Sequence, residues 1–140
     1  MFNLSYPDRL HIWANFRKQL ETSDTPFEDT LSFWSKAPLK SFCADPWDKA
    51  TWPDPWEMIL ENEYCEFVKI LAICYTLQLT DRFSQSTFEI HIVQDQKESN
   101  IMYILFVDNQ AIGYYNDNCI NGNDLSKFDT KMQHVMEFNY

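Results

Sequence analysis

Apolar residues recur at helical spacing in the middle of the chain, between Ile59 and Tyr75, where they lie three and four positions apart. Further apolar side chains fall on other sides of the same helix, at Ile70, Ile73, Cys74 and Leu77. A helix that is apolar on most sides is normally buried from several directions. The pattern therefore predicts a central buried helix over residues 62–79.

Proline and aspartate mark where this helical region begins. Asp54 precedes Pro55 and lies three residues before Glu57, which is the order of an N-cap, a first-turn proline and a capping-box acid. A helix should therefore begin at Pro55. A kink or a restart is expected near Asn62, which could cap the restarted helix and place Cys65 in its first turn.

Two helices are predicted before the central one. Ser5 is positioned to cap a first helix that should end near Glu21. Thr25 and Glu28 have the spacing of a capping box, with a proline at the first helical position between them. This second helix should stop before Pro38, because proline restricts the residue that precedes it.

Residues 38–53 should form a long loop that aromatic side chains hold against the helices, namely Phe42, Trp47 and Trp52. Trp47, Trp52 and Trp56 lie close together in the sequence, and tryptophan is enriched at interface hot spots. These three residues are therefore a candidate protein-binding surface. The alternative, which the usual burial of tryptophan favours, is that the rings only pack the loop down. The two roles can coexist.

Beyond residue 87 the pattern becomes that of strands. Apolar and other residues alternate from Phe88 to Ile92, which predicts a first strand. Residues 101–107 are apolar and β-prone, which predicts a strand buried on both faces, and residues 111–115 predict a third. Three adjacent strands with short turns indicate an antiparallel meander.

The remaining residues complete the predicted fold. Residues 116–124 should be a loop, and the tail at 133–138 is either a fourth, edge strand or a short helix. We predict one α+β domain over residues 1–140, with three N-terminal helices, the last central and buried, packed on a three- to four-stranded antiparallel sheet. Aromatic residues make up 16% of the chain and it has only two glycines, which favours a compact domain over a disordered one.

The chain is acidic, with a net charge of −10. Seven carboxylates lie between Asp45 and Glu66, against the single Lys49. Such a surface repels phosphate, so we expect no nucleic-acid partner. A basic protein partner fits the charge, although a solvated acidic face is the favoured interpretation.

The sequence also bears on compartment and cofactors. The start lacks the pattern of a secretory signal, and the apolar run at 67–79 is too short and too polar to span a bilayer. The four cysteines form no C-x-x-C pair, which predicts free thiols in a reducing cytoplasm. Neither His11 nor His134 has a partner at metal-ligand spacing, and Glu57 and Glu61 lack a Glu-x-x-His motif. We therefore expect no metal, cofactor or membrane segment.

Cys65 has the clearest catalytic potential in the sequence. A cysteine in the first turn of a helix has a depressed pKa, because the helix N-terminus favours the thiolate. His91 follows on the first predicted strand, and Asp108 lies further along the chain. This order resembles the transglutaminase-like and papain-like cysteine enzymes over about residues 60–117. The resemblance implies a cysteine hydrolase or acyltransferase with Cys65 as its nucleophile.

The chain departs from that family around each of the three residues. Cys65 has glutamates two positions before it and directly after it, and both would oppose thiolate formation. His91 lies in mid-strand, outside any His-Ala-Trp-like segment, and Asp108 lies in a predicted turn. Because Ile90 and Ile92 should face the core, His91 should point away from Cys65. We therefore expect no Cys65–His91 dyad, and a non-catalytic relative of this fold is favoured over an active enzyme.

A second resemblance rests on DPWDKATWPDPWEMI, residues 45–59, followed by EFVKILAICYTLQL, residues 66–79. These segments are similar to small proteins, without an assigned activity, of T4-like bacteriophages of marine cyanobacteria. The resemblance implies a phage-encoded protein made in the host bacterial cytoplasm, as a virion or assembly component. The leading hypothesis is thus a small, acidic, soluble, non-enzymatic protein that acts through protein–protein contacts, with the Cys65 hydrolase as the alternative.

Overall fold

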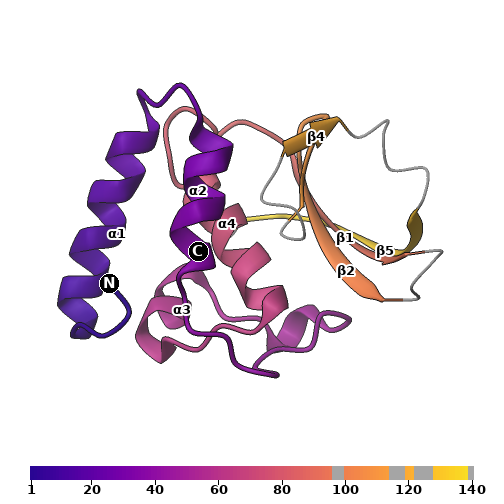
Figure 1. Cartoon of the computed structure of the whole chain (residues 1–140), viewed down its shortest axis with the longest axis horizontal. Coiled ribbons are helices and arrows are strands. Elements are labelled where there is room, and N and C mark those ends of the chain that lie inside the picture. The colour runs from indigo at the N-terminus through magenta and orange to yellow at the C-terminus, as the bar shows by residue number, and fades with distance from the viewer. Residues whose placement is uncertain (96–99, 114–118, 122–127, 139–140) are drawn as a thin grey trace. The chain divides into compact units, whose positions relative to one another are not determined.

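The computed structural model describes residues 1–95, 100–113, 119–121 and 128–138. The chain forms two compact units, Met1–Gln85 and Ser86–Tyr140, of which the first is helical and the second is a sheet (Figure 1). The predicted α+β class, with helices before an antiparallel sheet, is confirmed. That the chain is one domain with the central helix packed on the sheet stays a prediction.

The described part of the first unit holds four α-helices where three were expected. They are listed here in chain order with one short 3₁₀-helix: α1 Tyr6–Leu20, α2 Pro26–Ser35, η1 Lys49–Thr51, α3 Pro55–Glu61 and α4 Glu66–Gln78. The apolar pattern after Pro55 therefore belongs to two helices, α3 and α4, and the restart considered near Asn62 is real.

Asn62 ends α3 instead of capping α4, so that part of the prediction was wrong. Its backbone has the left-handed conformation, with φ 54° and ψ 39°, which asparagine tolerates better than most residues. Its side-chain amide donates to the carbonyl of Phe2 at 2.8 Å, which fixes this turn. The chain then runs extended to Cys65, which is the N-cap residue of α4.

The two predicted capping boxes differ in outcome. At α3 the box is present: the Glu57 N–H donates to Asp54 Oδ1 at 2.8 Å, and the Asp54 N–H donates to Glu57 Oε1 at 3.3 Å. At α2 it is absent: the Thr25 side chain makes no cap bond, and its hydroxyl donates instead to Asp29 Oδ1 at 3.0 Å. The side chain of Ser5 makes no cap bond to α1 either.

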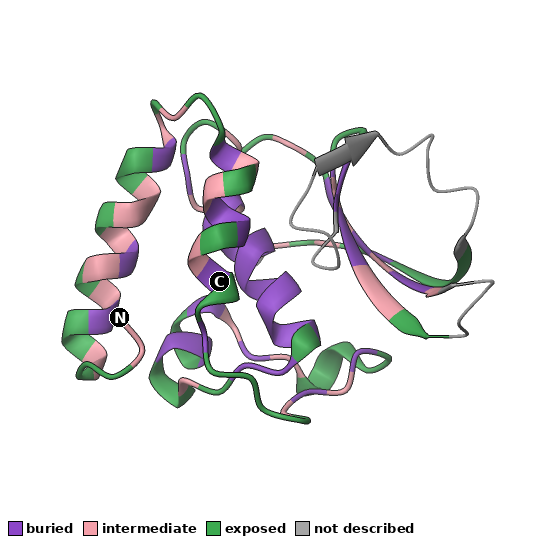
Figure 2. Ribbon diagram, viewed as in Figure 1, coloured by how far each residue is buried: buried purple, intermediate pink, exposed green. Residues whose placement is uncertain are grey.

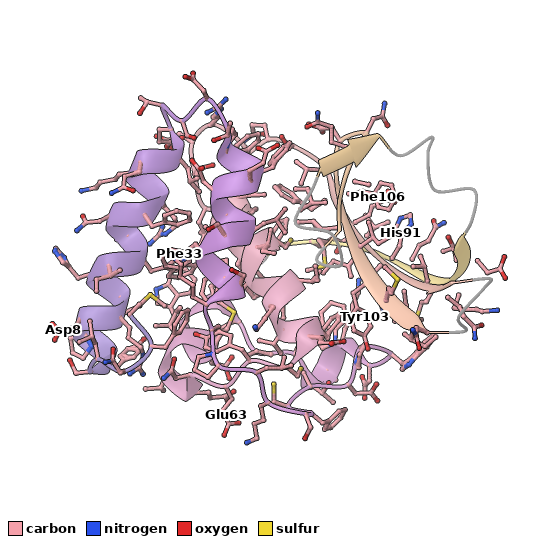
Figure 3. The ribbon with its side chains drawn as sticks, viewed as in Figure 1. Asp8, Phe33, Glu63, His91, Tyr103 and Phe106 are labelled. Carbon is pink, nitrogen blue, oxygen red and sulfur yellow. The ribbon has the colours of Figure 1, made fainter. Side chains whose placement is uncertain are left out.

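Helix α4 is the core of the first unit, since every residue from Phe67 to Leu77 is buried (Figure 2). The Thr76 hydroxyl oxygen of α4 accepts from the indole N–H of Trp13 and from that of Trp34, each at 2.9 Å. These bonds hold α1 and α2 against α4. Between α1 and α2, Phe33 stacks on Phe16 with ring centres 4.1 Å apart (Figure 3).

The long loop before α3 is held by one of the three expected aromatic residues. Trp52 donates its indole N–H to the carbonyl of Asp45 at 2.7 Å, and its ring lies 4.8 Å from that of Phe67. Phe42 and Trp47 are 64% and 49% exposed. The expectation that these two side chains pin the loop was therefore wrong, because Trp52 is the one of the three whose ring packs on a helix.

The second unit is a five-stranded sheet in the order β4-β3-β2-β1-β5, antiparallel at every pairing. Its strands are β1 Phe88–Asp95, β2 Ile101–Val107, β3 Gln110–Gly113, β4 Cys119–Asn121 and β5 Phe128–Val135. The predicted meander is confirmed by β1, β2 and β3. The expected tail strand at 133–138 overlaps β5 only at residues 133–135, because β5 runs from Phe128 to Val135, and the helix alternative was wrong.

The remaining differences concern the chain around β4. Residues 119–121 pair with β3, although they were expected in a loop, because a three-residue strand is too short to show alternation. The rest of the predicted loop, and residues 114–115 of the predicted third strand, lie outside the described residues.

Both faces of the sheet carry buried apolar side chains. Phe88, Ile90 and Ile92 lie on one face, in register with Val107, Leu105 and Tyr103. The other face has its own cluster of Val93, Ile104 and Ala111, flanked by Met102 and Phe106. The prediction that β2 is buried on both faces is thus right at its centre, whereas its first residue, Ile101, is exposed.

Candidate functional site

Cys65 lies where the extended segment after α3 turns into α4. Its backbone is extended, with φ −82° and ψ 172°, and its carbonyl accepts the first helical bond, from the Lys69 N–H at 3.0 Å. The side chain is only 5% exposed. The predicted position at the start of a buried helix is therefore correct within one residue, with the thiol at the N-cap.

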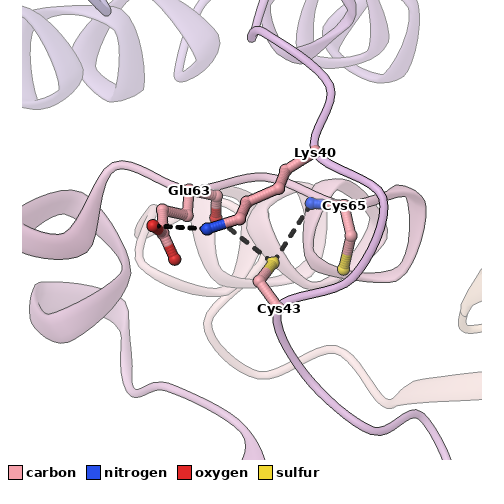
Figure 4. Close-up of polar contacts among 4 residues, drawn as sticks. All are labelled: Lys40, Cys43, Glu63 and Cys65. Atoms are coloured by element: carbon pink, nitrogen blue, oxygen red, sulfur yellow. Dashed lines mark hydrogen bonds and ion pairs between the residues drawn. The ribbon is translucent and has the colours of Figure 1, made fainter.

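A second cysteine, from the loop, lies directly against Cys65 (Figure 4). The backbone N–H of Cys65 donates to the Cys43 sulfur at 3.2 Å, and the Cys43 thiol donates to the Glu63 carbonyl at 3.6 Å. The loop reaches this position because it pairs with the segment before α4, through the Lys40 N–H and the Tyr64 carbonyl at 2.8 Å. Sequence reasoning missed this contact.

Two glutamates and one lysine lie close to the cysteine pair. The carboxylate of Glu63 accepts from the Lys40 ammonium at 2.7 Å (Figure 4). That hydrogen bond raises the pKa of Lys40. Glu66 is exposed on the first turn of α4. The charge of Glu63 is therefore partly compensated by Lys40 close to the cysteine pair.

The Cys43 thiol is held in its neutral form. Burial raises its pKa to about 11, and a hydrogen bond with the Cys65 side chain acts in the same direction. The Cys65 backbone N–H lowers it, but not enough to compensate. At neutral pH Cys43 is thus a protonated thiol, which is a poor nucleophile.

His91 belongs to the second unit and lies on β1. Its ring packs on Phe106, with centres 4.1 Å apart, and its Nε2 is 3.7 Å from Glu89 Oε2 (Figure 3). Burial lowers the pKa of His91, although Glu89 acts in the opposite direction. As predicted, the neighbouring Ile90 and Ile92 lie on the opposite face of the sheet. The absence of a Cys65–His91 dyad stays a prediction, because each unit is described by itself.

Asp108 has a structural role at the turn between β2 and β3. Its carboxylate accepts from the Thr87 N–H at 3.1 Å and from the Thr87 hydroxyl at 3.2 Å. The Asp108 N–H donates back to the Thr87 carbonyl at 2.9 Å. The backbone of Asp108 is left-handed, with φ 54°. This carboxylate fixes the start of β1 and is engaged there, which counts against a role as the orienting acid behind a catalytic histidine.

The three tryptophans of the candidate binding surface divide into two kinds. Trp47 in the loop and Trp56 on the first turn of α3 are 49% and 43% exposed. Trp52 is half-buried against Phe67. Trp47 and Trp56 therefore present ring surface to solvent. Trp52, which lies between them in the sequence, anchors the loop.

In the sequence, exposed large apolar side chains are concentrated around these tryptophans. The described residues include nine exposed large hydrophobic residues, and five of them lie in the segment 39–60: Leu39, Phe42, Trp47, Trp56 and Leu60. Four exposed carboxylates flank them, at Asp48, Glu57, Glu61 and Glu63. We refer to residues 39–60 as the apolar segment.

The described ranges offer neither a metal-ligand cluster nor a membrane-spanning helix. No group of three or more His, Cys, Asp or Glu side chains there could hold a metal ion. No helix there is both long and apolar enough to cross a bilayer.

Among solved structures, the fold is similar to that of calcium-bound LapG from Legionella pneumophila, a cysteine protease of transglutaminase-like topology. The TM-score is 0.63 over 98% of this chain and 77% of LapG, with 12% sequence identity. No family model matches the sequence. No curated protein matches it either. The expected transglutaminase-like topology is therefore supported at the level of the fold.

Proposed function

We propose that this chain is a non-catalytic protein of transglutaminase-like topology that binds a protein partner through the apolar segment. The observation that carries the proposal is the exposure of its five large apolar side chains, which lies between 43% and 64%. Single exposed apolar residues are common, but a concentration of large ones is typical of interaction sites. Exposed tryptophans are the side chains that contribute most at such sites.

The charge around the apolar segment indicates the chemistry of the partner. The exposed carboxylates at Asp48, Glu57 and Glu61 make its surroundings acidic. Complementary charge speeds association and selects among partners. The partner that fits is a protein whose surface offers apolar pockets ringed by lysine and arginine. The phage resemblance of residues 45–79 adds a setting, in which the chain is phage-encoded and binds a virion or assembly protein in the host cytoplasm.

Site-specific photo-crosslinking in infected or expressing bacterial cells tests this proposal. A photoreactive phenylalanine analogue placed at Trp47 or at Trp56 should capture the same protein from both positions. Leu4 is also exposed but lies outside the apolar segment, and the analogue placed there should not capture that protein. With the partner in hand, Trp47→Ala should weaken binding by roughly thirty-fold or more, as for a hot-spot residue. Equal capture from all three positions would refute the proposal.

The alternative is a cysteine hydrolase or acyltransferase that uses Cys65. It is favoured by the location of Cys65 at the start of a buried helix, in a fold similar to that of a cysteine protease. The contact with Cys43 counts against it. In acyl transfer the backbone N–H of the nucleophile commonly helps to stabilise the oxyanion, and here the Cys65 N–H is bonded to the Cys43 sulfur.

Thiol labelling separates the two functions. A nucleophile activated for catalysis should react with iodoacetamide near neutral pH much faster than Cys43 or Cys119. We expect Cys65 to show no such advantage, because it is almost fully buried. Cys65→Ser should accordingly leave partner binding intact. Selective rapid labelling of Cys65, together with turnover that Cys65→Ser abolishes, would favour the enzyme.

A further inference from the structure

Cys43 and Cys65 are distant in sequence but adjacent in space. The Cys43 sulfur lies 3.2 Å from the Cys65 backbone nitrogen, which is joined to the Cys65 thiol only through Cα and Cβ. The Cys43 thiol also donates to the carbonyl of Glu63, two residues before Cys65, at 3.6 Å. Each thiol is free in this structure, and Figure 4 shows both side chains at the junction of the loop and α4.

We propose that Cys43 and Cys65 form a reversible intramolecular disulfide by exchange with a low-molecular-weight disulfide such as oxidised glutathione. The bond would tie the loop to the N-terminus of α4. Disulfides in proteins of a reducing compartment are usually transient and redox-responsive. The cysteine pair is thus a modification site, and this inference does not depend on the proposed function.

The exchange proceeds in two balanced steps. The Cys43 thiolate attacks one sulfur of oxidised glutathione, so that a Cys43–glutathione disulfide forms and one glutathione thiolate leaves. The Cys65 thiolate then attacks the Cys43 sulfur and releases the second glutathione. The protein loses two electrons and two protons, and one glutathione disulfide becomes two glutathione thiols.

Accessibility determines the order of the steps. Cys43 is half-buried, whereas Cys65 is 5% exposed, so the external disulfide reaches Cys43 first. The second step needs only a small movement, because the Cys43 sulfur already lies 3.2 Å from the backbone nitrogen of Cys65. Cys74 is fully buried in the middle of α4, where an external disulfide cannot reach it. Among Cys43, Cys65 and Cys74, the cysteines whose side chains the structure describes, the fold therefore selects one pair.

The test is to incubate the whole chain with oxidised glutathione, to stop the exchange with acid, and to map the products by mass spectrometry. The expected main product has lost two hydrogens, contains a peptide pair joined through Cys43 and Cys65, and returns to the starting mass with dithiothreitol. The reaction rate should rise about tenfold per pH unit above neutrality, as the Cys43 thiolate becomes populated.

Variants and unfolding provide the controls. Cys74→Ala should form the bond as the parent chain does, whereas Cys65→Ala should accumulate the Cys43–glutathione adduct. In urea the same treatment should yield several cysteine pairings instead of one. The inference is overturned if the folded chain keeps only glutathione adducts, or if the Cys43–Cys65 pair is no more abundant in the folded chain than in urea.

Discussion

At the scale of single residues, the Cys43 thiol makes stability depend on pH. Its pKa is raised to about 11 by burial, whereas a cysteine in an unfolded chain titrates near about 8.5. Between these values the unfolded chain binds fewer protons than the folded one, so the free energy of unfolding falls as pH rises.

Replacing Cys43 tests this dependence. Between about pH 8 and about pH 10, the free energy of unfolding should fall less steeply for Cys43→Ala than for the parent chain. Urea denaturation followed by circular dichroism at each pH measures the difference. Burial also raises the pKa of Cys74 and of Tyr64, so a decline should remain in the variant. Equal slopes for the two chains would mean that Cys43 is not buried as described.

Leu71 tests whether α4 is the core. Its side chain is completely buried in the middle of that helix, and emptying such a leucine site usually costs roughly 2–5 kcal/mol. Leu71→Ala should therefore lower the free energy of unfolding by that amount. Leu60→Ala is the matched control, since Leu60 is 58% exposed and surface changes usually stay within about 0.5 kcal/mol. Similar losses for both variants would contradict the description of α4.

The spacing of a capping box predicted the correct structure at α3 but not at α2. Asp54 and Glu57 form the box that their spacing predicts. Thr25 and Glu28 have the same spacing, but the Thr25 backbone has φ −133° and ψ 59°, and its hydroxyl is turned toward Asp29, one turn later, to which it donates. A capping rule that reads one pair of residues cannot include this neighbour, which explains why one box was predicted correctly and the other was not.

At the scale of the helices, Thr76 joins α1 and α2 to α4. Its hydroxyl oxygen accepts hydrogen bonds from two buried indole N–H groups, and the hydroxyl donates to the Ala72 carbonyl. Thr76→Val preserves the shape of the side chain but leaves the N–H groups of Trp13 and Trp34 without this acceptor. Each unsatisfied donor costs about 1–3 kcal/mol.

We therefore expect Thr76→Val to lower the free energy of unfolding by roughly 2–6 kcal/mol. Tryptophan fluorescence during urea denaturation measures the loss and also reports on both indoles. Thr22→Val, at an exposed position, is the matched control. A loss for Thr76→Val as small as that for Thr22→Val would show that the two indole bonds do not stabilise the helices.

The candidate site shows which parts of an arrangement the sequence can predict. The location of Cys65 at the start of a buried helix followed from periodicity and a nearby asparagine. Its contact with Cys43 did not, because that contact depends on the path of a long loop through several prolines. Phe42 and Trp47 were misjudged for the same reason, since hydrophobicity alone does not say which aromatic side chain of a loop turns inward.

At the scale of the whole molecule, similarity to LapG indicates topology. At 12% identity it supports the fold alone, and function depends on the site built upon it. In this chain the position expected for a nucleophile is occupied by a buried cysteine whose backbone N–H donates a hydrogen bond to the Cys43 sulfur. The acid expected behind a histidine is bonded to Thr87. These contacts are the physical reasons for preferring binding over catalysis.

The cooperativity of unfolding tests the prediction that residues 1–140 are one domain. The sheet unit, Ser86–Tyr140, has fewer than about sixty residues, a size at which independent stability is marginal. We therefore expect one transition in scanning calorimetry for the whole chain, with an enthalpy of about 0.7 kcal/mol per residue near about 60 °C and equal calorimetric and van't Hoff values.

The Leu71→Ala variant, whose altered residue lies in the helical unit, tests whether the two units unfold together. If the chain is one domain, this variant should lower the temperature at which both the helical and the strand signals are lost. Two transitions, of which only one shifts in Leu71→Ala, would show that the helical and sheet units are separate domains.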